Sequence, residues 1–234
     1  MNMLTSKAEE EKLKLMSIDA VSIMVASFGL KRTSSLLNLP MVVVSRYANG
    51  RVLPKLDRAL GILEMFEKKY LTTVISQKVV KRDGVIDVSE VLHDTKLLDL
   101  IAYVGVKHFR GRGINKVITK EVDGIPLAVL TSRYLGSQLV VAKRRKEPGI
   151  DDFIEVRQVY GSGLYGYVYV PAKQLSKGDK VLIVDDVVRT GSTVRALKEA
   201  VQRARGNVVG VFSIAVLRRS LRELNLEVKS MIEL

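Results

Sequence analysis

The sequence predicts a small all-α domain over residues 1–71, followed over residues 72–234 by an α/β domain with a parallel sheet and a two-stranded hairpin. Three observations predict this. Apolar residues recur at helical spacing before residue 71, β-branched runs alternate with helical segments after Thr72, and a glycine-containing loop follows one strongly apolar run near residue 190. With 47% hydrophobic residues, both parts can bury a core.

Four helices are expected in the first part. In order they are Ala8–Phe28, which is one helix or two short ones, 31–37, Met41–Asn49 and a fourth that carries an apolar stripe from Leu56 to Tyr70. Gly29 stops the first helix, and Asn38 suits a left-handed turn after the second. Pro40 suits the start of the third, because the first turn of a helix needs no N–H group from it.

Alternating strands and helices are expected in the second part. The strands are Val117–Thr119, Leu139–Lys143, Val181–Asp185 and Val208–Val216, and the helices lie near 97–109, 126–136 and 192–205. This alternation is typical of a parallel sheet. Residues 153–170 alternate around Gly161 and Gly163 and are expected to form a hairpin.

Composition narrows the classes of protein. A net charge of +13 favours a polyanionic partner, with nucleic acid the leading candidate. The absence of cysteine excludes disulfides and thiolate metal sites. No apolar run is long enough for a membrane span, and the first residues lack the apolar stretch of a signal peptide, so we expect a cytoplasmic protein without a membrane partner.

The segment from Val181 to Val201 carries the strongest chemical signal. Asp185 and Asp186 end an apolar strand, where carboxylates can accept hydrogen bonds from vicinal sugar hydroxyls. Four residues then form a loop before a helix: Thr190, Gly191, Ser192 and Thr193. Backbone N–H groups and hydroxyls at a helix N-terminus are suited to a phosphate, and the glycine lets the backbone approach it.

This string resembles the phosphoribosyl-pyrophosphate-binding motif of type I phosphoribosyltransferases, and the resemblance covers most of residues 85–216. It implies the type I phosphoribosyltransferase-like fold, with the acidic pair on the ribose hydroxyls and residues 190–193 on the 5-phosphate. It also implies a pyrophosphate loop at 120–126, which contains Asp123 and Gly124, and a hood at 147–170. Lys143 and Arg144 lie where orotate phosphoribosyltransferases keep basic residues for diphosphate. The alternative for 143–146 is a solvated basic loop.

The segment Leu30–Gly50 resembles the helix-turn-helix of bacterial and archaeal regulators, through its spacing and its Ser-Arg-Tyr-x-Asn-Gly string. This resemblance implies a second helix in the major groove of DNA, where Arg46 could bond guanine edges. The predicted DNA contacts are Lys31, Arg32, Val42, Ser45, Arg46, Asn49 and Arg51, with Lys31, Arg32 and Arg51 on phosphates. The alternative is a helical oligomerisation cap with a solvated basic face.

Together the two parts resemble an archaeal family, related to orotate phosphoribosyltransferases, that regulates glucose and fructose catabolism genes. We therefore predict a transcription regulator that binds double-stranded operator DNA as a dimer or dimer of dimers. Its second domain would sense a phosphorylated effector such as a sugar-acid phosphate, without catalytic residues.

Arg189 would suit a second anionic group on that effector, or would cap nearby carbonyls at the surface. Purine-specific transferases often have an aspartate at its position, and an arginine cannot take a proton. No cofactor is required, with Mg²⁺ joining the site if phosphoribosyl pyrophosphate binds. Two alternatives stay open: an active orotate-type phosphoribosyltransferase, and a purine-repressor-like regulator that senses phosphoribosyl pyrophosphate.

Overall fold

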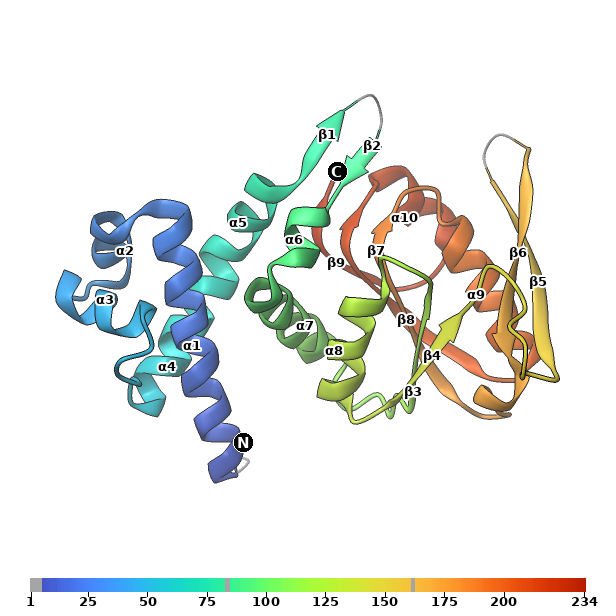
Figure 1. Cartoon of the computed structure of the whole chain (residues 1–234), viewed down its shortest axis with the longest axis horizontal. Coiled ribbons are helices and arrows are strands. Elements are labelled where there is room, and N and C mark those ends of the chain that lie inside the picture. The colour runs from blue at the N-terminus through green and yellow to red at the C-terminus, as the bar shows by residue number, and fades with distance from the viewer. Residues whose placement is uncertain (1–5, 83–84, 161–162) are drawn as a thin grey trace.

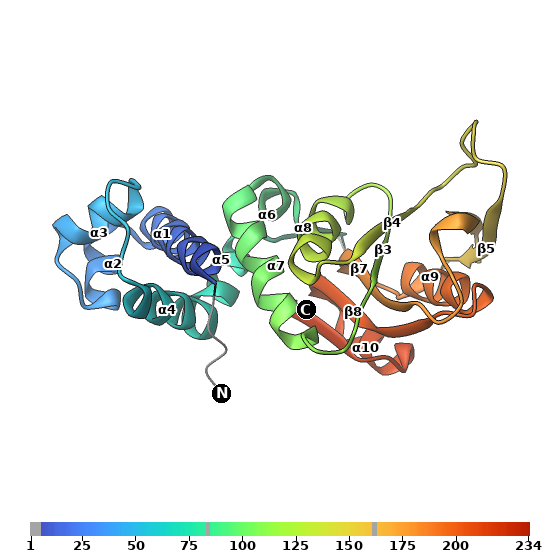
Figure 2. The same ribbon diagram turned by 90° about the horizontal axis from the view of Figure 1, so that it is seen from below.

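The computed structural model describes residues 6–82, 85–160 and 163–234. A group of helices at the N-terminal end is followed by a parallel sheet with helices on both faces and a projecting hairpin (Figure 1). The molecule is elongated, with the helical group at one end and the hairpin at the other (Figure 2).

The N-terminal helices agree with the sequence pattern. In order they are α1 Lys7–Phe28, α2 Leu30–Leu37, α3 Met41–Ala48 and α4 Leu56–Met65, after which a π-helical turn, η1 Phe66–Tyr70, leads into α5 Leu71–Lys78. Gly29 ends α1 with a φ of 80°, and Asn38 adopts the predicted left-handed conformation after α2. The helical run therefore extends to Lys78, past Tyr70, where the predicted apolar stripe ends.

A five-stranded, all-parallel sheet forms the centre of the second part. Its order is β4–β3–β7–β8–β9, with β3 Lys116–Lys120, β4 Gln138–Ala142, β7 Lys180–Val188, β8 Asn207–Val216 and β9 Val228–Glu233. The four predicted strands are confirmed and β9 was missed. Because β9 lies at an edge and only Ile232 is buried in it, it lacks the apolar run of a central strand.

Side chains of the central strand alternate between two hydrophobic clusters. Leu182 and Val184 of β7 face the cluster that includes α7 Thr95–Phe109 and α8 Ile125–Leu135. Val181 and Ile183 face the opposite cluster, which includes α9 Ser192–Arg203 and the hairpin. Because both faces are covered, the strand reads as one continuous apolar run in the sequence.

Two antiparallel hairpins flank the sheet. The larger pairs β5 Phe153–Val159 with β6 Tyr165–Pro171, as predicted for residues 153–170, although Gly161 lies outside the described residues. The smaller pairs β1 Val80–Arg82 with β2 Val85–Asp87 and was not predicted, since three-residue strands give too short a pattern. Short helices complete the chain: α6 Ser89–His93, α10 Arg218–Leu224 and the 3₁₀ turn η2 Ala172–Gln174.

The helical group packs directly on the sheet part, with α1 against α7 and α5 against β9. One hydrophobic cluster continues from α1 through α7 to the sheet. An ion pair of 3.0 Å joins Lys96 to Asp19, and the Tyr134 hydroxyl donates to Asp99 at 2.8 Å beside Met16. The N-terminal helices therefore share the core of the sheet part.

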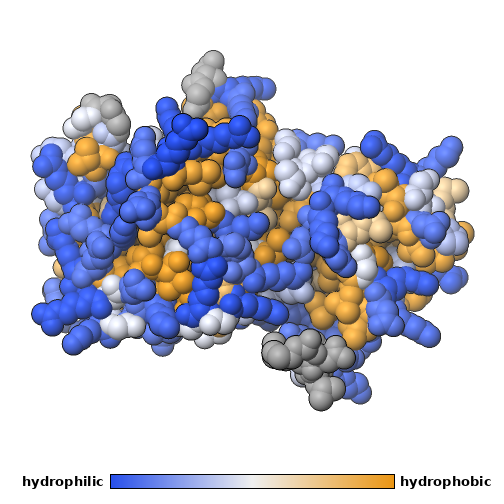
Figure 3. Space-filling model, turned by 180° about the vertical axis from the view of Figure 1, so that it is seen from behind, coloured by the Kyte–Doolittle hydropathy of each residue, from blue (hydrophilic) through white to orange (hydrophobic). Residues whose placement is uncertain are grey.

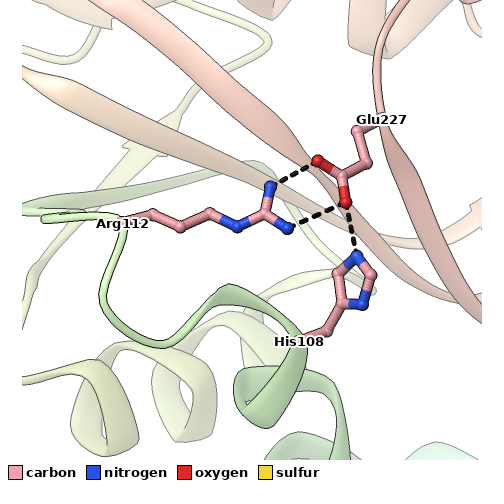
Figure 4. Close-up of polar contacts among 3 residues, drawn as sticks. All are labelled: His108, Arg112 and Glu227. Atoms are coloured by element: carbon pink, nitrogen blue, oxygen red, sulfur yellow. Dashed lines mark hydrogen bonds and ion pairs between the residues drawn. The ribbon is translucent and has the colours of Figure 1, made fainter.

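Glu227, Arg112 and His108 form a polar cluster at the surface between α7 and β9. Glu227 accepts hydrogen bonds from both Arg112 and His108, the latter at 2.6 Å (Figure 4). These contacts, that from Arg112 above all, lower the pKa of Glu227 to about 2. The cluster thus ties the segment that precedes β9 to the end of α7.

No helix in the described part of the chain is both long and apolar enough to cross a membrane. On the back of the molecule, hydrophobic patches alternate with hydrophilic side chains along its whole length (Figure 3).

Candidate functional site

A cavity of about 490 Å³ opens where β3 and β7 end and α9 begins. Carboxyl ends of parallel strands are the usual place for ligands in such sheets. All the predicted ligand residues except Lys143 line it: Asp123, Gly124, Arg144, Asp185, Asp186, Arg189, Thr190, Gly191, Ser192 and Thr193. Three segments far apart in the sequence therefore meet at one edge of the sheet.

The acidic pair lies at the end of β7. Asp185 is buried, and this burial, together with the neighbouring Asp186, raises the pKa of its carboxyl well above the usual range. Asp186 is partly exposed, and its N–H donates to the Asp185 carboxylate at 3.2 Å. The two carboxyl groups lie side by side at the end of the strand, where both can accept hydrogen bonds from hydroxyl groups.

The loop from Lys120 to Gly124 closes over this acidic pair. A Cβ atom at Gly124 would lie 2.4 Å from the Thr119 Oγ1 and 3.4 Å from the Asp185 Oδ1, so only glycine fits without displacing them. The peptide bond between Glu121 and Val122 is cis. The Glu121 carboxylate accepts from the Arg144 N–H at 2.6 Å, which holds the loop to the segment after β4.

The loop before α9 is held from the opposite side by α10. Gly191 has a φ of 69°, and a Cβ on it would lie 2.7 Å from the Leu224 side chain. The Ser220 hydroxyl donates to the Arg189 carbonyl, and the Leu217 N–H donates to the Val188 carbonyl at 3.0 Å. Ser192, Thr193 and Val194 of the first turn of α9 line the cavity, and the N-terminus of a helix attracts anions.

The positive charges around the cavity differ in their contacts. Lys143 does not line the cavity, and its Nζ pairs with Glu147 at 2.9 Å and with Glu121 at 4.0 Å. Arg144 lines the cavity. Arg189 lines it too, but its guanidinium donates to the Ile86 carbonyl of β2 at 2.8 Å, the carbonyl-capping alternative considered for it.

Lys120 and Gln158 also line the cavity; Lys120 is the first residue of the predicted pyrophosphate loop but was not singled out, and Gln158 was not predicted. Burial lowers the pKa of the Lys120 ammonium, followed in effect by the charge of Arg144. Position at the end of a strand could have identified Lys120. Nothing local marks Gln158, because the fold of the hairpin brings it to the cavity.

A wider groove of about 660 Å³ lies on the other side of residues 190–193, between the large hairpin, α9 and α10. It shares Tyr160, Thr190 and Ser192 with the cavity. Neither acid of the pair lines it, so of these two hollows the smaller cavity is the one that combines the acids with residues 120–124 and 190–193.

The residues predicted to contact DNA lie far from this cavity, on α2, α3 and the turn that follows. Several residues of the Ser-Arg-Tyr-x-Asn-Gly string stabilise the local structure around the end of α3. The Asn49 side chain donates to the Ser45 carbonyl at 2.8 Å, Tyr47 is buried and accepts from Arg58 at 3.3 Å, and Gly50 has a φ of 65°. The string therefore packs and ends α3.

Similar proteins are named as enzymes. A hypoxanthine/guanine phosphoribosyltransferase of Methanobacterium lacus is 31% identical over 154 residues, which cover 64% of this chain and 79% of that protein. A xanthine phosphoribosyltransferase of Streptococcus pyogenes is 28% identical over 178 residues, covering 72% of this chain and 91% of that protein.

Solved structures share the fold of the sheet part. The adenine phosphoribosyltransferase of Rhodothermus marinus superposes with a TM-score of 0.64 at 23% identity, over 70% of this chain and 98% of that one. The fold predicted for the second part, a type I phosphoribosyltransferase sheet, is thereby confirmed.

These names overturn the predicted function. The relatives above are phosphoribosyltransferases and not transcription regulators, so the prediction of a DNA-binding regulator of sugar catabolism is wrong. The predictions of operator DNA as a partner, of a regulatory effector and of a domain without catalytic activity are therefore wrong as well. The basic surplus and the helix-turn-helix spacing misled the prediction, since both are compatible with a helical group that packs on an enzyme.

The family model for the phosphoribosyl transferase domain matches residues 87–232, which is more than half of the chain and contains the whole cavity. The chain therefore belongs to the phosphoribosyl transferase domain family.

Proposed function

We propose that this chain is an active phosphoribosyltransferase that joins the 5-phosphoribosyl group of phosphoribosyl pyrophosphate to a 6-oxopurine base. The proposal depends on one observation: the acidic pair, residues 190–193 (the phosphate loop) and the Lys120–Gly124 loop all line one cavity. The names of the relatives, xanthine and hypoxanthine/guanine phosphoribosyltransferases, support the class of base.

In this proposal each segment of the cavity binds one part of the sugar substrate. Residues 190–193 hold the 5-phosphate through N–H groups and hydroxyls at the start of α9. Asp185 and Asp186 bind the two ribose hydroxyls. Lys120 and Arg144 face the pyrophosphate and stabilise the negative charge that develops on it as its bond to the ribose carbon breaks and the bond to the base nitrogen forms.

Arg189 has a different role from the aspartate often found at its position. It stays cationic at neutral pH and cannot take the proton of the base. Its bond to the Ile86 carbonyl instead fastens the β1–β2 hairpin beside the cavity.

Mg²⁺ fits the site only together with the substrate. The residues that the structure describes contain no group of three or more His, Cys, Asp or Glu able to hold a metal ion. Mg²⁺ is commonly bound by one or two carboxylates plus substrate phosphates, which Asp186 and the pyrophosphate would provide. When bound, the ion neutralises part of the pyrophosphate charge.

The division of the chain into residues 1–71 and 72–234 is part of this proposal, with the whole cavity in the second part. The first part then serves as a helical group packed on α7.

A turnover assay tests the proposal. The purified chain is incubated with phosphoribosyl pyrophosphate, Mg²⁺ and, separately, xanthine, hypoxanthine, guanine, adenine or orotate, and the nucleotide product is measured by chromatography. We expect product with at least one 6-oxopurine, and a loss of about 100-fold or more in Asp185→Asn/Asp186→Asn, because the hydroxyl contacts are then weakened. Absence of product with every base would refute the proposal, and product with orotate alone would refute the class of base.

A further inference from the structure

A buried amide of the large hairpin touches both anion-binding loops. Gln158 of β5 is 2% exposed, and its Nε2 donates to the hydroxyls of Ser192 and Thr193, each at 3.1 Å. Its Oε1 accepts from the Lys120 Nζ at 2.7 Å. One side chain therefore joins the end of β3, the hairpin and the first turn of α9.

The position of Gln158 is one where the hairpin alone would favour an apolar residue. Val156, two residues earlier on the same face of β5, is fully buried, as is Val168, its partner on β6. A polar group buried among such residues costs free energy unless hydrogen bonds replace its contacts with water. Here the three contacts to Lys120, Ser192 and Thr193 replace them.

The directions of these hydrogen bonds matter for ligand binding. A hydroxyl that accepts from an amide keeps its own hydrogen for another acceptor, so Ser192 and Thr193 can each donate to a phosphate oxygen. An ammonium has three donors, and the one bonded to Gln158 leaves the others of Lys120 for an anion. Gln158 thus orients both groups without competing with a ligand.

We propose that Gln158 is a positioning residue that couples the loops 120–124 and 190–193. It fixes their binding groups relative to one another, so that the 5-phosphate and the pyrophosphate of one substrate can be bound at the same time. This inference rests on the proposed function and concerns binding of the phosphorylated sugar, not of the base. It also assigns the large hairpin a direct part in that binding through β5.

Direct binding measurements test the coupling without requiring turnover. Calorimetric affinities for ribose 5-phosphate and, separately, for inorganic pyrophosphate with Mg²⁺ are compared in the full chain and in Gln158→Met, which keeps the approximate volume but loses the polar contacts. We expect both affinities to fall by about tenfold, because the hydroxyls of Ser192 and Thr193 and the Lys120 ammonium are no longer oriented by Gln158. The matched control is Val159→Thr, the next residue on β5, whose side chain is 53% exposed.

Kinetics separate positioning from a general loss of structure. The KM for phosphoribosyl pyrophosphate should rise by about tenfold in Gln158→Met, while the KM for the base stays within about twofold. Equal changes in both constants would overturn the positioning role. If Gln158→Met does not fold, Gln158→Glu keeps the length but has only acceptors at neutral pH, so the two hydroxyls would turn their hydrogens toward it and binding of ribose 5-phosphate should weaken.

The outcomes distinguish this inference from the proposed function. Wild-type affinity of the variant for both ligands, or a loss for only one of them, would overturn the coupling. If the wild-type chain binds both ligands but forms no nucleotide with any base, the proposed function fails while the coupling is still decided by the affinities. If it binds neither ligand, both proposals are overturned.

Discussion

The helical group and the carboxyl edge of the sheet each contain a motif that resembles a known functional site, yet only one of them bears on function. In α3 the motif serves partly to end and pack the helix, since Asn49 donates to the Ser45 carbonyl and Tyr47 is buried. At the edge of the sheet, residues 190–193 face a cavity. The contrast between the two motifs is therefore one of place: only the second lies at a cavity, together with an acidic pair.

The largest expected effect is that of Gly191→Ala in the phosphate loop. The substitution forces a residue with a Cβ into a φ of 69° and places that Cβ 2.7 Å from Leu224. We expect kcat/KM to fall by about 100-fold, because the loop must shift away from the phosphate position, and the free energy of unfolding to fall by about 1–3 kcal/mol. Steady-state kinetics and urea unfolding measure the two effects.

Gly136→Ala is the matched control for this prediction. Gly136 has a φ of 65°, but nothing lies within 4 Å of its Cβ position, and it is not part of the cavity. We expect Gly136→Ala to lower the free energy of unfolding by about 1 kcal/mol and to leave kcat/KM unchanged. Equal losses of activity in the two variants would show that contact with α10 does not shape the loop.

The second prediction compares two glycines within helices, one in each region. A Cβ at Gly105 of α7 would lie 2.1 Å from the Phe212 ring, so Gly105→Ala should cost about 1–3 kcal/mol of stability. Gly61 of α4 has no atom within 4 Å of its Cβ position, so Gly61→Ala should stabilise the protein by about 0.5–1 kcal/mol. Chemical unfolding measures both, and stabilisation by Gly105→Ala would contradict the close packing of α7 on β8.

The same contrast explains how far the sequence predicted the fold. Helices α1 and α4 and strands β7 and β8 were predictable from their apolar patterns, and α2 and α3 from the turn signals Gly29, Asn38 and Pro40. The β1–β2 hairpin, α10 and β9 were not, since they are short and depend on long-range contacts such as that between Ser220 and the Arg189 carbonyl. The cavity was predictable from the acidic pair and the phosphate loop, whereas Gln158 reaches it only through the fold of the hairpin.

The third prediction concerns the helical group alone. Asn49→Ala removes the side-chain hydrogen bond to the Ser45 carbonyl at the end of α3, at an exposed position. We expect a loss of about 0.5–1 kcal/mol of stability and unchanged transferase activity. Thermal unfolding and the turnover assay measure the two, and a strong loss of turnover would show that α3 acts on the cavity.

The smallest expected effect lies at the surface cluster of Glu227, Arg112 and His108, and it depends on pH. The pKa of Glu227 is lowered from its usual 4.5 to about 2, because Arg112 and His108 hydrogen-bond its ionised form. A lowered pKa in the folded state means that the contribution to stability is complete above pH 4.5 and is lost as the pH falls toward 2. The difference in Tm between the wild-type chain and Glu227→Gln should therefore shrink as the pH falls from 4.5 toward 2. Since the cluster is exposed, the difference should also decrease in high salt. A difference that grew as the pH fell from 4.5 toward 2 would show that the ionised carboxylate does not stabilise the link between α7 and β9.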